Sequence, residues 1–319
     1  MIGRVLIGLA AGAASALMFA SVVSGALISL LLFYLAPLPL LVAAIGWGPL
    51  AAAIGGIAAA AGVGAVFGLN YCIAYAIAFA APAWWLGHLA LLGRAASDAS
   101  SRHGAADIRE LEWYPVGRIL LWIAASATLT TLGLMLTLGS DPAAMAETLK
   151  RGLDQLLAAN AIAADDQLVD ALIAIMPICA ILGVFVVLTL NVWLAATIAA
   201  TSGRLRRPWP DLKATALPPL TLAALCLAIA LCFSGGLTAL LAKLVASALM
   251  MAYAFTGFAV LHTLTLALKS RTFWLGSAYT LVVLFMWPVL AMVVLGLADA
   301  VFGFRARYLR SRPPPLPAP

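Results

Sequence analysis

The chain has 319 residues, of which 65% are hydrophobic and only 9% are charged. Soluble domains carry charge on about a quarter of their residues, so this composition excludes a water-soluble enzyme, a disordered protein and a conventional nucleic-acid binder. The net charge of +6 does not point to nucleic acid, because basic residues in so apolar a chain gather at the cytoplasmic edges of membrane spans. The sequence predicts an all-α, polytopic integral membrane helical bundle whose first partner is the lipid bilayer.

Two charge-free stretches, 5–35 and 38–92, precede the first polar loop. The first is long enough for one tilted or broken span, and it continues too far beyond Arg4 to be the core of a cleaved signal peptide. Glycine and proline interrupt the second stretch, which predicts a short helix at 38–47 and full helices at 49–68 and 70–92.

A polar segment at 94–117 leads into a span at 118–138 and then into an acidic insert at 140–170. Asp141 and Pro142 open the insert with the residue types of a helix N-cap and a first helical position. Apolar residues then repeat on one face, with charges on the other. We expect an amphipathic helix that lies on the membrane surface or over the mouth of a pocket.

The C-terminal half alternates apolar and basic segments. We expect a span at 171–200, a basic loop at 201–219, a short apolar piece at 220–233, a long helix at 237–268, a last span at 273–298 kinked at Trp287-Pro288, and a basic, proline-rich tail at 305–319. Positive charge places loops 94–117 and 201–219 inside a bacterial inner membrane and the acidic insert outside. If 220–233 is re-entrant, both termini are cytoplasmic and the single domain at 1–304 crosses eight times; a full crossing there gives nine.

Small residues recur at helical spacing in the first and third helices. Such stripes let two helix backbones approach closely, since lipid provides no hydrophobic drive for helices to associate. One interpretation is packing within the chain, and the other is a docking face for another membrane subunit. The stripes include Gly8, Gly12 and Ala16 in the first helix, and Gly56 and Gly64 in the third.

Polar and aromatic residues at membrane depth are few, and each is a candidate site residue. Asn70 begins a helix that contains Tyr71 and Tyr75, and the exposed N–H groups of such a start can bind a polar ligand. His88 and Asn191 extend this tentative ligand site. The alternative is structural: interhelical hydrogen bonds from the asparagines and an interfacial aromatic belt around His88.

Catalytic motifs are missing from the sequence. It contains no P-loop, no HExxH and no nucleophile serine motif. Asp165, Asp166 and Asp170 resemble the magnesium-binding aspartates of prenyl-transferring enzymes, but their spacing is one residue too long and no second cluster follows. We therefore expect no enzymatic activity, no metal site and no cofactor.

The end of the last span combines an acid with a base six residues later. Asp299 lies near the cytoplasmic boundary, where Arg305 or Arg307 can fold back and neutralise it. Together with Gly296, this G-x-x-D-x-x-x-x-x-R ending resembles the bacterial membrane proteins of the DUF2232 (YybS-like) family. That family is similar to the substrate-binding S components of energy-coupling-factor vitamin transporters and to MreD-like proteins, which implies an S-component-like core.

Three functions follow from these observations. The first is small-ligand binding or a role in membrane transport. The second is a structural subunit of cell-envelope assembly, similar in role to MreD. The third, a membrane enzyme acting on an isoprenoid or lipid, depends on Asp165, Asp166 and Asp170 alone.

Overall fold

The computed structural model describes residues 1–95, 111–139, 141–160 and 165–310. Most of the predicted 94–117 loop, a few residues of the acidic insert and the prolines of the tail lie outside this range. The described chain is a helical bundle, which confirms the predicted fold class. Seven of its helical segments are long and apolar enough to cross a membrane, or eight if the bent pair at the C-terminus forms one span.

The N-terminal third forms four spans whose breaks follow glycine and proline. α1 (Ile2–Ala20) continues through a 3-10 turn, η1 (Ser21–Ser24), and α2 (Leu27–Tyr34) joins α3 (Pro37–Trp47) in the second span. α4 (Pro49–Phe67) is followed by α5 (Leu69–Tyr75), a π-helical turn, η2 (Ala76–Ala80), and α6 (Ala81–Ala90). Gly48 and Gly68 have φ values of 107° and 97°, a region that favours glycine. The predicted breaks are confirmed, except that residues 27–34 belong to the second span.

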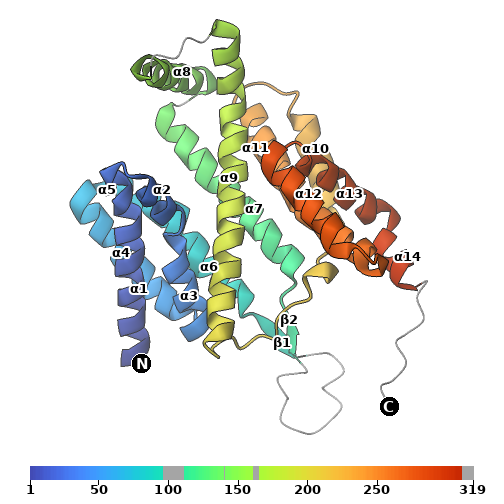
Figure 1. Ribbon diagram of the computed structural model, residues 1–319. Coiled ribbons are helices and arrows are strands. Elements are labelled where there is room, and N and C mark those ends of the chain that lie inside the picture. The colour runs from blue at the N-terminus through green and yellow to red at the C-terminus, as the bar shows by residue number, and fades with distance from the viewer. Residues whose placement is uncertain (96–110, 140, 161–164, 311–319) are drawn as a thin grey trace.

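The middle of the chain contains the longest helix. A short antiparallel hairpin, β1 (Gly93–Ala95) and β2 (Leu111–Trp113), precedes α7 (Val116–Leu138). α8 (Pro142–Ala159) lies across one end of the bundle, and α9 (Asp166–Thr201) runs through its centre (Figure 1). As predicted, Asp141 caps α8, because its Oδ1 accepts hydrogen bonds from the N–H groups of Ala143 and Ala144 at 3.0 Å.

The C-terminal third contains more helices than the sequence predicted. A 3-10 turn, η5 (Leu212–Ala214), and α10 (Leu220–Leu231) precede α11 (Gly236–Leu264). A second 3-10 turn, η6 (Thr265–Ala267), leads to α12 (Arg271–Phe285), α13 (Val289–Phe302) and α14 (Phe304–Arg310). With 12 residues, α10 is shorter than the about 20 residues that a crossing needs.

The predicted single span at 273–298 is wrong, because the chain reverses where a kink was expected. Gly257 of α11 lies against the carbonyl of Met292, while Gly296 of α13 lies against the carbonyl of Tyr253. Figure 1 shows α11 and α13 side by side and running in the same direction, from the end that holds α8 toward α14, so the two helices are parallel. α12 starts directly after α11 and must run back between their two ends. Met286, with a φ of 54°, makes this reversal.

The reversal also changes the distribution of charge. If 273–298 were one span, Lys269 and Arg271 would lie at the opposite end of the bundle from α14. Because α12 and α13 are separate, both residues lie at the end that also holds η5, the basic loop at 201–219 and the start of α1 (Figure 1). We call this the basic end; α8 marks the opposite end.

The predicted small-residue stripes pack within the chain. α1 and α4 are parallel, since Gly8 lies against the carbonyl of Ala51 and Gly12 against that of Gly55. In α4, Gly56 faces Ala80 and Gly64 faces Cys72. These glycines therefore contact neighbouring helices of the same chain, which is the first of the two interpretations of the stripes.

Alanine substitution at two glycines tests this packing. Gly12→Ala places a Cβ against the Gly55 carbonyl, whereas the same change at Gly62 meets open space. We expect Gly12→Ala to lower the free energy of unfolding by about 1–3 kcal/mol, the usual cost of overpacking, and Gly62→Ala to leave it unchanged. Thermal unfolding in detergent measures both. Equal stability of the two variants would contradict close α1–α4 contact.

Cysteine labelling tests the reversal at Met286. In a background without the four native cysteines, Ser270→Cys and Asp154→Cys each place one exposed thiol, the first at the basic end and the second on α8. We expect a membrane-impermeant maleimide to reach the two thiols from opposite sides of the membrane. Labelling of both thiols from the same side would contradict the reversal and support a single span at 273–298.

Candidate functional site

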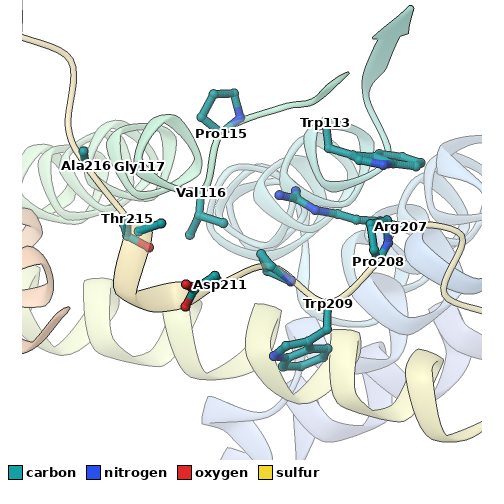
Figure 2. A pocket seen from close by; sticks show the side chains of 12 residues that line it. Trp113, Pro115, Val116, Gly117, Arg207, Pro208, Trp209, Asp211, Thr215 and Ala216 are labelled. Carbon is teal, nitrogen blue, oxygen red and sulfur yellow. The ribbon is translucent and has the colours of Figure 1, made fainter. Parts of the chain in front are cut away.

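A cavity of about 410 Å³ opens at the basic end between three segments. These are the β-hairpin, the first turn of α7 and the loop that joins α9 to α10. Figure 2 shows Arg207 extending from this loop beneath the Trp113 ring toward Val116. The lining residues are Trp113, Pro115, Val116, Gly117, Arg207, Pro208, Trp209, Pro210, Asp211, Ala214, Thr215 and Ala216.

The hairpin positions Trp113. Gly93 pairs with Trp113 across the ladder, and Arg94 pairs with Glu112. The Arg94 and Glu112 side chains also form an ion pair at 2.7 Å, although both are exposed, so it adds little stability. Gly93 leaves room for the indole, since a Cβ there would lie 3.4 Å from the ring. The strands thus fix one wall of the cavity.

The loop after α9 is held by Arg204, prolines and an aspartate. The Arg204 guanidinium lies 4.4 Å from the centroid of the Trp47 ring, a cation–π contact at the end of α3. Pro208 and Pro210 restrict the backbone between the contacts. Asp211 Oδ1 accepts a hydrogen bond from the N–H of Lys213 at 3.1 Å and starts the η5 turn.

A buried ion pair anchors the end of this loop to the last helices. Arg305 Nε lies 2.7 Å from Asp299 Oδ2, and the two side chains are 13% and 8% exposed. Arg305 Nη1 also donates hydrogen bonds to the carbonyls of Lys213 and Thr215. Arg305 thus neutralises Asp299, as predicted, and its hydrogen bonds to the loop also fix the cavity wall. On the other side, Gly117 of α7 lies against the carbonyl of Ala216.

Two hydrogen-bond donors of the cavity lining have no acceptor among the described residues. Trp113 Nε1 is buried without a partner. Arg207 is half-buried and forms no ion pair or hydrogen bond with the described part of the chain. Burial lowers the pKa of its guanidinium from the ordinary value, because desolvation disfavours the charged form. A positive charge that is partly removed from water and has no counter-charge attracts an anion.

The predicted ligand residues do not converge on one site. Asn70 and Tyr71 are exposed at the start of α5, about 27 Å along the helix from His88 at the basic end. His88 is half-buried with its ring 5.8 Å from that of Trp85, as an interfacial aromatic belt predicts. The remaining two, Tyr75 and Asn191, are structural. None of the five lines either cavity.

Tyr75 and Asn191 instead make buried interhelical hydrogen bonds. The hydroxyl of Tyr75 lies 2.5 Å from Ser15 Oγ, and its side chain is fully buried. Asn191 Nδ2 donates to the carbonyl of Tyr34 in α2 at 2.9 Å, and also to that of Val187, one turn earlier in α9 itself, at 2.8 Å. Both side chains thus join helices of the N-terminal third to their neighbours, and neither is available to a ligand from outside.

The residues of the predicted C-terminal motif, by contrast, do come together. Gly296 allows α13 to approach α11, and three residues later Asp299 meets Arg305. Sequence reasoning missed Trp113 and Arg207, which are separated along the chain by the three helices α7, α8 and α9. One sequence signal could have found this site. Two tryptophans, Trp113 and Trp209, each lie within two residues of a proline in a segment that is otherwise polar.

Removing the anchor is expected to release the loop. Arg305→Ala leaves Asp299 buried and unpaired, and breaking a buried ion pair costs about 3–5 kcal/mol. We expect a lower unfolding temperature and faster hydrogen–deuterium exchange at residues 211–217. Arg310→Ala, a change at an exposed arginine of the same helix, is the matched control. Similar exchange in both variants would show that Arg305 does not hold the loop.

No protein-family model, curated protein or solved structure matches the chain. The resemblance to the DUF2232 family and the S-component-like core therefore stay predictions.

Proposed function

We propose that this multi-pass membrane protein binds a small anionic ligand with a flat apolar part at the basic end of its bundle. The observation that supports the proposal is the Arg207 guanidinium, which has no partner among the described residues and lies in a cavity that two tryptophans line. Its volume of about 410 Å³ falls within the about 300–1,000 Å³ that is typical of small-molecule pockets.

Each lining group has a definite role in this proposal. Arg207 binds a carboxylate or phosphate, for which its forked N–H groups are suited. Trp113 and Trp209 supply flat apolar surface for stacking. Asp211 also lines the cavity, but its carboxylate lies 4.0 Å from Lys213 Nζ and bonds to its own loop. The cavity is thereby left with a net attraction for anions.

The concentration of basic residues at this end supports a cytoplasmic location for the cavity in a bacterial inner membrane. In that orientation both ends of the bundle's chain, α1 and α14, face the cytoplasm. The ligand then comes from the cytoplasm or is released into it, as in a transport-related role. Catalysis is not part of the proposal: Asp165 caps α9, and Asp166 and Asp170 face Lys150 at 4.0 and 3.5 Å.

One observation favours the alternative role of a structural subunit in envelope assembly. α12 has no buried residue, so its apolar surface faces either lipid or a second protein. Recovery of a single stoichiometric membrane partner after crosslinking through α12, without stabilisation by any small anion, would favour this alternative.

A pair of adjacent arginines allows a sharp test of ligand binding. The probes are aromatic carboxylates and aryl phosphates, each compared with its uncharged amide or alcohol. We expect the anions to raise the unfolding temperature of the wild-type protein. Arg207→Gln should weaken their binding about tenfold to a hundredfold, the equivalent of one charged hydrogen bond.

Arg206→Gln is the matched control, because Arg206 is exposed and does not line the cavity. It should bind the anions as the wild type does. Equal weakening in both variants would reduce the effect to general electrostatic attraction, and an absence of stabilisation by any anion would refute the proposal.

A further inference from the structure

We propose a second binding site, beneath α8 at the end of the bundle opposite the basic end. It takes a single-chain amphiphile with an anionic headgroup, such as a fatty acid, whose chain enters an apolar cavity while its carboxylate pairs with Lys243. This site is separate from the cavity that holds Arg207 and does not depend on the function proposed for it.

The cavity lies where four helices meet, and its wall is apolar except for one cation. Its volume is about 170 Å³. α8 contributes part of this wall and lies across this end of the bundle (Figure 1). The lining residues are Met135, Pro142, Met145, Ala146, Leu149, Ile173, Ala174, Pro177, Ile178, Leu240, Lys243 and Leu244.

Lys243 is the charged residue of this wall. It lies about 10 Å along α11 from Gly236, within an otherwise apolar span. Its Nζ has no hydrogen bond or ion pair with the described residues. A lysine at the edge of the hydrocarbon region is costly unless it reaches water or an anion. The side chain is exposed, so an anion from the membrane surface can reach it.

The acidic residues of the insert do not provide that anion. Asp166 and Asp170 pair with Lys150, at 4.0 and 3.5 Å. Glu147 lies 4.0 Å from Arg151 on α8 itself. No ion pair of the described chain joins an acid of α8 or of the start of α9 to Lys243, so this lysine remains without a counter-charge there.

α8 suits this position at the membrane surface. It is amphipathic, and Met145, on its apolar face, is only 3% exposed and lines the cavity. Such a helix lies in the plane of the interface, where headgroups and the first methylenes of a lipid chain are found. A ligand that enters below α8 therefore places its chain among apolar side chains and its headgroup near the level of Lys243.

The size of the cavity selects among lipids. A volume of about 170 Å³ is below the about 300 Å³ at which pockets enclose a whole drug-sized molecule. It accommodates part of one hydrocarbon chain. A two-chain phospholipid would have to leave its second chain outside the cavity, so we commit to a single-chain anion.

Photocrosslinking in phosphatidylcholine nanodiscs tests the site with the full chain. The probes are palmitate with a diazirine in its tail, the matching fatty alcohol, and phosphatidylglycerol with the same diazirine tail. We expect palmitate to label residues 142–149, 173–178 and 240–244 about fivefold more than the alcohol does, and to exceed the phospholipid as well. Unlabelled decanoate should compete, whereas decanol should not.

Substitutions at Lys243 assign the preference to its charge. Lys243→Met should reduce labelling by palmitate to the level of the alcohol, while Lys243→Arg should retain it. Lys269→Met, which removes an exposed lysine at the basic end, is the matched control and should label as the wild type does. If Lys243→Met unfolds, the wild-type comparison of acid with alcohol and the Lys243→Arg variant still decide.

Three results would overturn the proposal. Equal labelling of these segments by palmitate and the alcohol in the wild type would show that the site does not recognise an anionic headgroup. Undiminished palmitate labelling in a folded Lys243→Met variant would show that Lys243 does not bind the headgroup. If phosphatidylglycerol labelled the segments as strongly as palmitate does, the site would not be restricted to single-chain anions.

Discussion

Direct contact between the backbones of parallel helices is the constraint on which the arrangement of this bundle depends. At Gly8 and Gly12 in α1 and at Gly257 and Gly296 in α11 and α13, a side chain would meet a carbonyl of the neighbouring helix. Without a hydrophobic drive in lipid, such close packing supplies the association. Two parallel helices also require a third segment that returns the chain between them. α2 with α3, and α12, are these returning segments, and they bring the basic segments to one end.

Gathering the cations at one end creates the conditions for the candidate site. Exposed arginines there remain in water and need no counter-charge. The cavity is different because the loop after α9 is fixed at both ends, by Arg204 on Trp47 and by Arg305 bonded to its carbonyls. A fixed loop cannot turn Arg207 fully toward water, so part of its hydration is lost without an acceptor in return. Asp299 is already paired with Arg305.

The parts of this structure that could be predicted from sequence are those set by local chemistry. The lengths of the apolar stretches predicted most of the spans. Glycine and proline at 47–49 and 68–70 predicted the breaks between them, and Asp141 with Pro142 predicted the start of α8. Trp287-Pro288 could not be interpreted the same way, because a proline signals a kink and a reversal equally. The ligand residues failed for a related reason: helical periodicity shows which residues share a face but not which faces meet. Trp113 and Arg207 meet only through the fold.

Arg207 and Lys243 differ from Arg206 and Lys269 in what surrounds them. Arg206 and Lys269 are exposed in loops, where water satisfies them at no cost to stability. Arg207 is flanked by indoles and prolines, and Lys243 stands in a wall of methionine, leucine and isoleucine side chains. The two environments also select different anions. Flat aromatic surface favours a compact, planar ligand, whereas a narrow aliphatic cavity at the membrane surface favours a chain. The two proposed anion sites thus lie at opposite ends of the bundle, one facing water and the other facing lipid.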